Sequence, residues 1–140
     1  MGKILVSACL LGDNCKYNGG NNYSEKTAAF TAGKEVIRIC PELLSGLGVP
    51  RPRAEIRDGI VYNEKGENVH RFFELGVDRA MERIAGEEID CAVLQSRSPS
   101  CGVRQVYDGR FSGTLKDGMG LFAQRLKDSG IRVIDVADLD

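Results

Sequence analysis

A short apolar run leads directly into a serine-rich loop in the stretch Cys91-Ala92-Val93-Leu94-Gln95-Ser96-Arg97-Ser98-Pro99-Ser100-Cys101-Gly102. The apolar residues 91–94 are typical of a buried strand. Pro99 removes one backbone donor and stiffens the loop, and Gly102 lets backbone or ligand approach the neighbouring thiol of Cys101. Hydroxyl and thiol side chains therefore crowd the end of a strand, where they can hold a metal centre or an oxyanion. The alternative is an ordinary Ser/Pro/Gly turn with a buried thiol.

Apolar segments on both sides of this stretch alternate with helical ones. Strands are expected at residues 3–8, 35–39, 89–95 and 131–134, and helices at residues 24–30, 71–85 and near 119–126. Ser24 is expected to cap the first helix, and Gly130 to close the last. Two further segments, residues 54–63 and 103–112, each carry a central Asp-Gly pair, which predicts two β-hairpins with two-residue turns. Residues 43–53 are expected to form a loop.

This alternation of strands and helices predicts a single-domain, three-layer α/β/α fold over residues 1–140. The sheet is expected to be mainly parallel and Rossmann-like, with one or two β-hairpins beside it. Helices on both faces of the sheet require strands that are apolar on both sides, and the expected strands broadly meet this requirement. Ligands of open parallel sheets bind beyond the carboxyl ends of the strands, so a functional site is expected at that edge.

Composition narrows the class of protein. The chain has 140 residues, of which 42% are hydrophobic and 28% charged, as in an ordinary globular protein. A net charge of −1 offers no electrostatic support for nucleic-acid binding. No apolar run is long enough to span a membrane, and the N-terminus lacks the long apolar centre of a signal peptide. We therefore expect a cytoplasmic protein that binds neither nucleic acid nor membrane; its oligomeric state is left open.

The cysteines indicate metal or redox chemistry. They number five, an odd count, and no Cys-x-x-Cys pair is present, which argues against a disulfide framework and against ribbon-type zinc sites. Cys9, Cys40 and Cys101 each follow the end of an expected strand. If the strands are parallel, these thiols gather at one edge of the sheet. Cys91 lies within a strand and is expected to be a small buried apolar residue.

Three converging thiolates have few uses. They can hold an iron–sulfur cluster and leave one iron of a four-iron cluster open to a substrate. Cys15 lies six residues after Cys9 in a flexible loop. It can occupy that open position as a fourth ligand, and its spacing alone does not decide whether it does. One alternative is a non-catalytic zinc or nucleotide-binding module, in which Cys15 joins the other three thiols. Another is a sulfurtransferase that carries a persulfide on one activated thiolate.

Polar residues close to these cysteines suggest a reaction. Glu42 follows Cys40 by two residues, and a carboxylate beside an apolar metal pocket can transfer protons; the alternative is a surface or helix-capping role. Ser98 and Ser100 can orient a substrate or relay a proton, or they can simply bond within the turn. Arg51 is a candidate to bind an anionic or carbonyl group of the substrate, although such arginines often form surface pairs.

Six motifs in this order resemble one family over nearly the whole chain, the thiouracil desulfidase family, a small bacterial family long labelled a domain of unknown function. The motifs are Ser7-Ala8-Cys9-Leu10-Leu11-Gly12, Cys15-Lys16-Tyr17-Asn18-Gly19, Cys40-Pro41-Glu42, Pro50-Arg51-Pro52, Ser98-Pro99-Ser100-Cys101-Gly102 and Tyr107-Asp108-Gly109-Arg110-Phe111-Ser112-Gly113. Two positions depart from the family pattern: Gln95 stands where relatives often have lysine, and Val69-His70 where they often have valine–threonine. The Gln95 departure lies beside the serine-rich loop and bears on the choice of substrate.

The resemblance implies a non-redox desulfidase. Its open iron would take sulfur from a thiolated pyrimidine such as thiouracil, or from a similar small thiocarbonyl compound, and sulfide would be released. Carried over by motif, the ligands of a [4Fe-4S] cluster are Cys9, Cys40 and Cys101. The resemblance also implies Glu42 as the acid/base and Ser98 as its partner in positioning or proton transfer. Such clusters are sensitive to oxygen, so aerobic preparation is expected to leave bare thiols.

Overall fold

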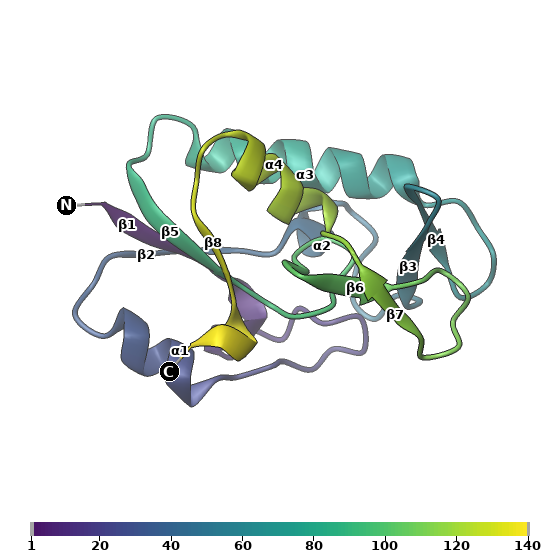
Figure 1. Ribbon diagram of the computed structural model, residues 1–140, viewed down its shortest axis with the longest axis horizontal. Helices are drawn as coiled ribbons and strands as arrows, with labels where there is room; N and C mark the ends of the chain where they lie inside the picture. The colour runs from purple at the N-terminus through teal and green to yellow at the C-terminus, as the bar shows by residue number, and fades with distance from the viewer. Residues whose placement is uncertain (1, 140) are drawn as a thin grey trace.

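A four-stranded parallel sheet forms the centre of the protein in the computed structural model, which describes residues 2–139 (Figure 1). The strand order is β2-β1-β5-β8, and the strands are β1 (Lys3–Ser7), β2 (Val36–Ile39), β5 (Ile89–Leu94) and β8 (Val133–Asp135). Each neighbouring pair is parallel; Leu5 of β1, for example, lies opposite Ile37 on one side and Ala92 on the other. The carboxyl ends of all four strands therefore face the same edge of the sheet.

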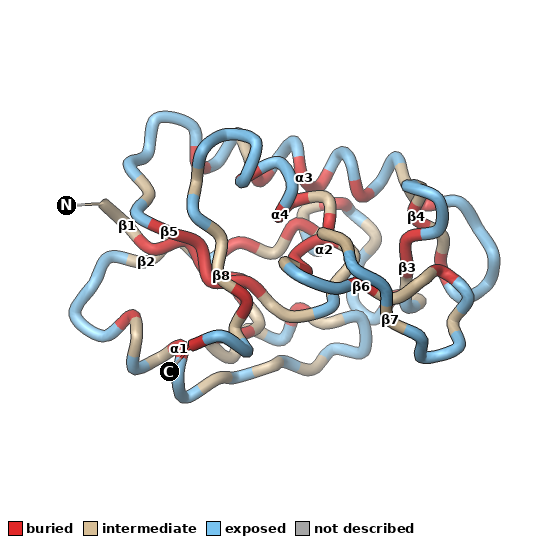
Figure 2. Tube along the Cα trace, viewed as in Figure 1, coloured by how far each residue is buried: buried red, intermediate tan, exposed pale blue. Residues whose placement is uncertain are grey.

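Helices cover both faces of this sheet. The helices α3 (His70–Ile84) and α4 (Leu121–Asp128) lie on one face, and α1 (Glu25–Thr31) lies on the other (Figure 1). Two apolar clusters fill the spaces between the layers, and the buried residues in Figure 2 accordingly concentrate along the central strands. The expected three-layer α/β/α architecture is confirmed. Within residues 2–139, no helix combines the length and the apolar character needed to cross a membrane.

The two clusters show why the strands are apolar on both sides. Side chains from alternate positions of β1 and β5 point to opposite faces, so the strands contribute to both clusters. The cluster under α3 and α4 contains Leu5, Ala92, Leu94, Val77, Ala80, Phe122 and Leu126 among others. The cluster on the side of α1 contains Ile4, Val6, Leu10, Cys91 and Val93, with Phe30 packed against it. Cys91 is thus a buried apolar residue, as expected.

The predicted helix starts are largely confirmed, but short helical turns were missed. The Ser24 hydroxyl caps α1 by accepting a hydrogen bond from the backbone N–H of Thr27 at 3.1 Å. Two 3₁₀ turns, η1 (Ala8–Leu11) and η2 (Val136–Asp138), follow β1 and β8 and were not expected. They are too short to produce a helical apolar repeat in the sequence.

The segment after β2 corrects the expectation of a loop over residues 43–53. It begins with a one-turn helix, α2 (Pro41–Leu44), whose N-cap is Cys40. The Cys40 Sγ accepts the backbone N–H of Leu43 at 3.4 Å, and Pro41 occupies the first helical position, where its missing N–H costs nothing. Gly76 of α3 lies against the Pro41 carbonyl, so α2 packs closely on α3. This helix fixes where Cys40 and Glu42 stand.

Two β-hairpins lie at the end of the molecule beyond the carboxyl edge of the sheet (Figure 1). The first, β3 (Ala54–Arg57) with β4 (Ile60–Asn63), turns at Asp58 and Gly59, whose φ values of 53° and 80° confirm the expected tight turn. The second, β6 (Gln105–Tyr107) with β7 (Leu115–Asp117), is joined by residues 108–114, so the expected two-residue turn is wrong.

A distant carboxylate holds the connection between β6 and β7. The Glu55 Oε1 of β3 accepts the backbone N–H groups of Gly109 and Phe111, both at 3.1 Å. Phe111 adopts a positive φ of 56° to present its N–H in this way. The Asp108-Gly109 pair thus belongs to a wider loop that is tied to the first hairpin.

Candidate active site

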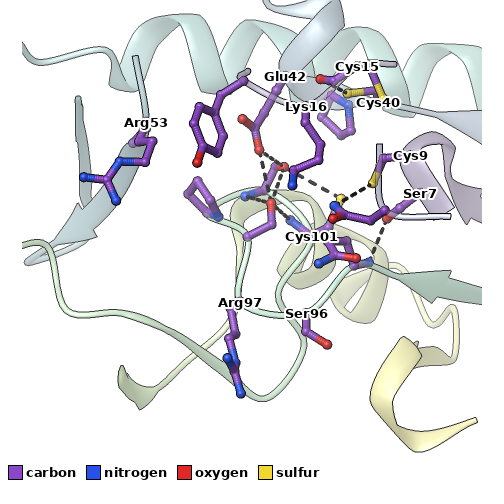
Figure 3. A pocket seen from close by; sticks show the side chains of 18 of the residues that line it. Ser7, Cys9, Cys15, Lys16, Cys40, Glu42, Arg53, Ser96, Arg97 and Cys101 are labelled. Carbon is purple, nitrogen blue, oxygen red and sulfur yellow. Dashed lines mark hydrogen bonds between the residues drawn. The ribbon is translucent and has the colours of Figure 1, made fainter. Parts of the chain in front are cut away.

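A cavity of about 640 Å³ opens at the carboxyl ends of β1, β2 and β5 (Figure 3). Four of the five cysteines line it: Cys9 in η1, Cys15 in the following loop, Cys40 at the start of α2, and Cys101 in the loop after β5. The parallel sheet brings these segments together, because each of them leaves a strand at the same edge. Cys91 lies elsewhere, in the apolar cluster on the side of α1.

Each of the three cysteines that follow a strand has a hydrogen-bonding group beside its sulfur. The Asn22 side-chain amide donates to Cys9 Sγ at 3.5 Å, and the Ser100 hydroxyl lies 3.7 Å from Cys101 Sγ. The third bond, to Cys40 Sγ, is the helix cap described above. Donors directed at sulfur stabilise the thiolate, which is the form that binds metals.

The pKa values of the thiols differ because of their neighbours. A hydrogen bond from Cys15 is the main cause that lowers the pKa of Cys9 to about 7, and Asn22 adds to it. The same Cys15 thiol lowers the pKa of Cys40. Its position next to Cys40 and Cys9, together with burial, raises the pKa of Cys15 itself. Burial raises the pKa of the Cys101 thiol. The Cys15 thiol thus retains a proton that Cys9 and Cys40 lose more readily.

Glu42 and two serines form a connected polar network on the cavity wall (Figure 3). The Ser98 and Ser100 hydroxyls donate to Glu42 Oε2 at 3.1 Å and 2.8 Å, and they lie 2.9 Å from each other. Ser98 Oγ also accepts the backbone N–H groups of Ser100 and Cys101, both at 3.1 Å. Ser98 therefore bonds within the turn, which was one of the alternatives considered from the sequence, and its hydroxyl also contacts the Glu42 carboxylate.

Arg51 contacts the other oxygen of the same carboxylate. Its Nη2 donates to Glu42 Oε1 at 3.3 Å and to the Cys15 carbonyl at 2.8 Å, and its Nη1 donates to the Gly48 carbonyl at 3.0 Å. Only 3% of the Arg51 side chain is exposed. The guanidinium that the sequence suggested for substrate binding is therefore engaged with groups of the protein itself.

The loop that carries Ser98, Ser100 and Cys101 is held by the start of α4. The backbone N–H groups of Leu121 and Phe122 donate to the carbonyls of Pro99 and Ser100 at 2.9 Å and 2.8 Å. Gly120, the N-cap of α4, lies so close to Ser100 that a Cβ there would overlap the Ser100 backbone. The loop thus owes its shape to the helix that follows it.

A second anchor ties the beginning of the loop to the sheet. The Ser96 hydroxyl donates to the buried carboxylate of Asp135, at the end of β8. Gly102, at the other end of the loop, lies against the carbonyls of Ser98 and Gln105. The absence of a side chain at Gly102 therefore allows backbone segments to approach each other closely beside the thiol.

Sequence reasoning missed two residues of the thiol environment. Ser7, at the end of β1, acts to lower the pKa of the Cys101 thiol against the larger effect of burial, and its hydroxyl accepts the backbone N–H of Gln95 at 3.0 Å. Its position two residues before Cys9 in a strand-end motif was a usable signal. Asn22 reaches Cys9 across a loop, and nothing local in the sequence distinguishes it from the other asparagines there.

Thiols and an acidic network at the strand ends of a parallel sheet place this protein among α/β proteins with a thiol-lined site. The chain belongs to the 2-thiouracil desulfurase family, whose model matches residues 4–138. It is 35% identical over 147 aligned positions to the uncharacterised protein YbbK of Bacillus subtilis (strain 168), covering 98% of this chain and 97% of YbbK. The solved structure of TudS, a [4Fe-4S]-dependent thiouracil desulfidase, matches with a TM-score of 0.91 and 36% identity, covering 99% of this chain and 93% of TudS.

Proposed function

We propose that this protein is a non-redox desulfidase that removes sulfur from a thiolated pyrimidine, such as thiouracil, or from a similar small thiocarbonyl compound. A [4Fe-4S] cluster would be its cofactor, as in TudS. The observation that carries the proposal is the single cavity in which thiols from three strand ends stand beside the network of Glu42, Ser98 and Ser100. The cavity volume of about 640 Å³ falls within the range of small-molecule sites.

The thiols present suit such a cluster. Cys9, Cys40 and Cys101 would hold it, and a hydrogen-bonding group already lies beside each of their sulfurs. Across residues 2–139, no group of three or more His, Cys, Asp or Glu side chains is arranged around a single metal ion. A four-iron cluster takes thiolates that stand further apart than the ligands of one ion. Cys15 would be a pocket thiol or a fourth ligand.

The bound cluster would supply a thiophilic Lewis acid with an open position, which hard cations such as magnesium do not offer. The chain's own residues would manage the proton transfers. Glu42 would accept a proton from the attacking water, Ser98 would hold the carboxylate in place and share the proton, and Ser100 would bind a polar edge of the substrate. A carbon–oxygen bond forms and the carbon–sulfur bond breaks, so that the thiocarbonyl compound and water give the carbonyl compound and hydrogen sulfide. No electrons are supplied or removed.

Anaerobic purification followed by a sulfide-release assay tests this function. We expect brown protein with about four irons per chain that releases sulfide from thiouracil. Colourless protein loaded with zinc would favour a structural metal site instead. Metal-free protein that keeps full activity would contradict the proposal.

A further inference from the structure

We propose that Arg51 is a positioning residue of this site, which fixes the Glu42 carboxylate in the cavity without contacting the substrate. The inference rests on the proposed desulfidase function, in which Glu42 is the acid/base. It replaces the expectation from the sequence that Arg51 binds the substrate.

The Arg51 guanidinium is enclosed by groups of the protein. Its side chain is 3% exposed, and both of its terminal nitrogens donate to protein oxygens. Only its Nε has no hydrogen-bond partner within the described residues 2–139. A substrate would have to displace the bonds to the Cys15 and Gly48 carbonyls in order to engage this group, and a buried carbonyl left unpaired is costly.

The Glu42 carboxylate is held from two sides. The hydroxyls of Ser98 and Ser100 occupy Oε2, while Arg51 Nη2 occupies Oε1 at 3.3 Å. With partners on both oxygens, the carboxylate plane has one preferred orientation. Removal of Arg51 would leave Glu42 attached at one oxygen only, free to rotate about its side-chain bonds. Errors of about 1 Å in the placement of a reacting group can cost roughly 100-fold in rate.

The same arginine connects three segments of the chain. Its backbone N–H donates to the Tyr17 carbonyl at 2.8 Å, while its side chain reaches the Cys15 carbonyl and Glu42. The loop with Cys15, the start of α2 and the loop before β3 thus meet at one guanidinium. A planar fork suits several acceptors in different directions, whereas a lysine ammonium keeps the charge but not this geometry.

The variant Arg51→Met tests the inference, because methionine keeps much of the volume and removes the donors. In anaerobically prepared protein we expect an unchanged iron content, a kcat reduced by about 10- to 100-fold and a KM within about twofold of the wild type. The kcat of Arg51→Lys is expected to lie between those of the wild type and of Arg51→Met. The matched control is Arg79→Met, because Arg79 also donates to a carbonyl of α2, that of Leu44 at 2.7 Å, but from the solvent side. Its kcat should equal that of the wild type.

A double variant separates positioning from a merely structural role. In the Glu42→Gln background, Arg51→Met should cause little further loss of kcat, because the group that it positions is already absent. A multiplicative loss would overturn the inference. A large rise in KM at constant kcat would overturn it as well and would identify Arg51 as a substrate ligand. Loss of iron in Arg51→Met would assign the residue to cluster assembly instead.

Thermal unfolding of the metal-free protein makes the test independent of the proposed function. The Tm shift of the double variant should be smaller than the sum of the shifts caused by Arg51→Met and Glu42→Gln alone, because both changes remove the same contact. Additive shifts would overturn the Arg51 inference whatever the activity. Wild-type protein that holds iron but releases no sulfide would instead contradict the desulfidase function and leave this coupling measurable.

Discussion

Cys15 and Cys101 both line the cavity, yet their sulfurs are placed differently. The Cys15 thiol lies next to the sulfurs of Cys9 and Cys40, whereas the sulfur of Cys101 lies beside the hydroxyl of its own chain neighbour, Ser100. A serine at position 15 can still donate its proton to one of its two neighbours at a time. A serine at position 101 replaces the thiolate that would bind iron.

The two serine variants are therefore expected to differ in iron content. Cys15→Ser should keep about four irons per chain after anaerobic reconstitution, and Cys101→Ser should lose most of them. Iron analysis of both proteins, with circular dichroism to confirm folding, checks this. An equal loss in both variants would mean that four cysteines close the cluster.

Glu42 gives a second prediction for a single residue. Glu42→Gln preserves the shape of the side chain and can still accept hydrogen bonds, but it cannot take up a proton. We expect normal iron content and a kcat on thiouracil lowered by about 100- to 10,000-fold. Glu74→Gln, an exposed change on α3, serves as the control and should have wild-type activity. Unchanged turnover in Glu42→Gln would remove this residue from the mechanism.

Among the helices and strands, α4 has the most direct influence on the site. Its first backbone N–H groups bind the carbonyls of the loop that presents Cys101, and its N-cap, Gly120, makes room for that loop. The backbone of Gly120, with φ of −68° and ψ of 161°, is accessible to any residue. An added methyl group would therefore act only by steric overlap.

Gly120→Ala is expected to destabilise the protein by about 1–3 kcal/mol and to lower its iron content, because the loop must move away from α4. Gly118→Ala is the matched control, since an added Cβ there meets only the side chain of Val106, at 3.3 Å. Urea unfolding and iron analysis of both variants measure the difference. Equal behaviour of the two variants would show that the approach of α4 to the loop is not what places Cys101.

At the scale of the whole molecule, the proposed cluster would join segments that leave three different strands. Cys9 follows β1, Cys40 follows β2 and Cys101 lies in the loop after β5. A cofactor held by all three would bind the folded protein and not the unfolded chain, and such binding raises stability.

Anaerobic reconstitution should therefore raise the Tm of the wild-type protein by about 5 °C or more relative to its metal-free form. Cys101→Ser should show no such rise. Cys91→Ala should show it in full, although its starting Tm is lower because a buried side chain has been shortened. A wild-type Tm that is independent of iron would mean that the thiols do not share one cofactor.

The sequence by itself determined the parallel sheet and the edge at which the thiols meet. Apolar runs and helical repeats are local patterns, and the carboxyl ends of parallel strands must share one edge. From these, the convergence of Cys9, Cys40 and the loop at residues 96–102 follows without any knowledge of packing. The turn at Asp58-Gly59 is equally local, because two positive φ values require such residues.

Only the tertiary structure decided how the cavity wall is built. The one-turn helix α2 is too short for a repeat, and the loop at residues 108–114 takes its shape from Glu55, which is distant in the sequence. Two of the partners of Arg51, the Cys15 carbonyl and Glu42, likewise come from other segments. Hydrogen bonds between segments that meet only after folding leave no periodic trace in the sequence, so packing alone determines which carbonyl or carboxylate a side chain reaches.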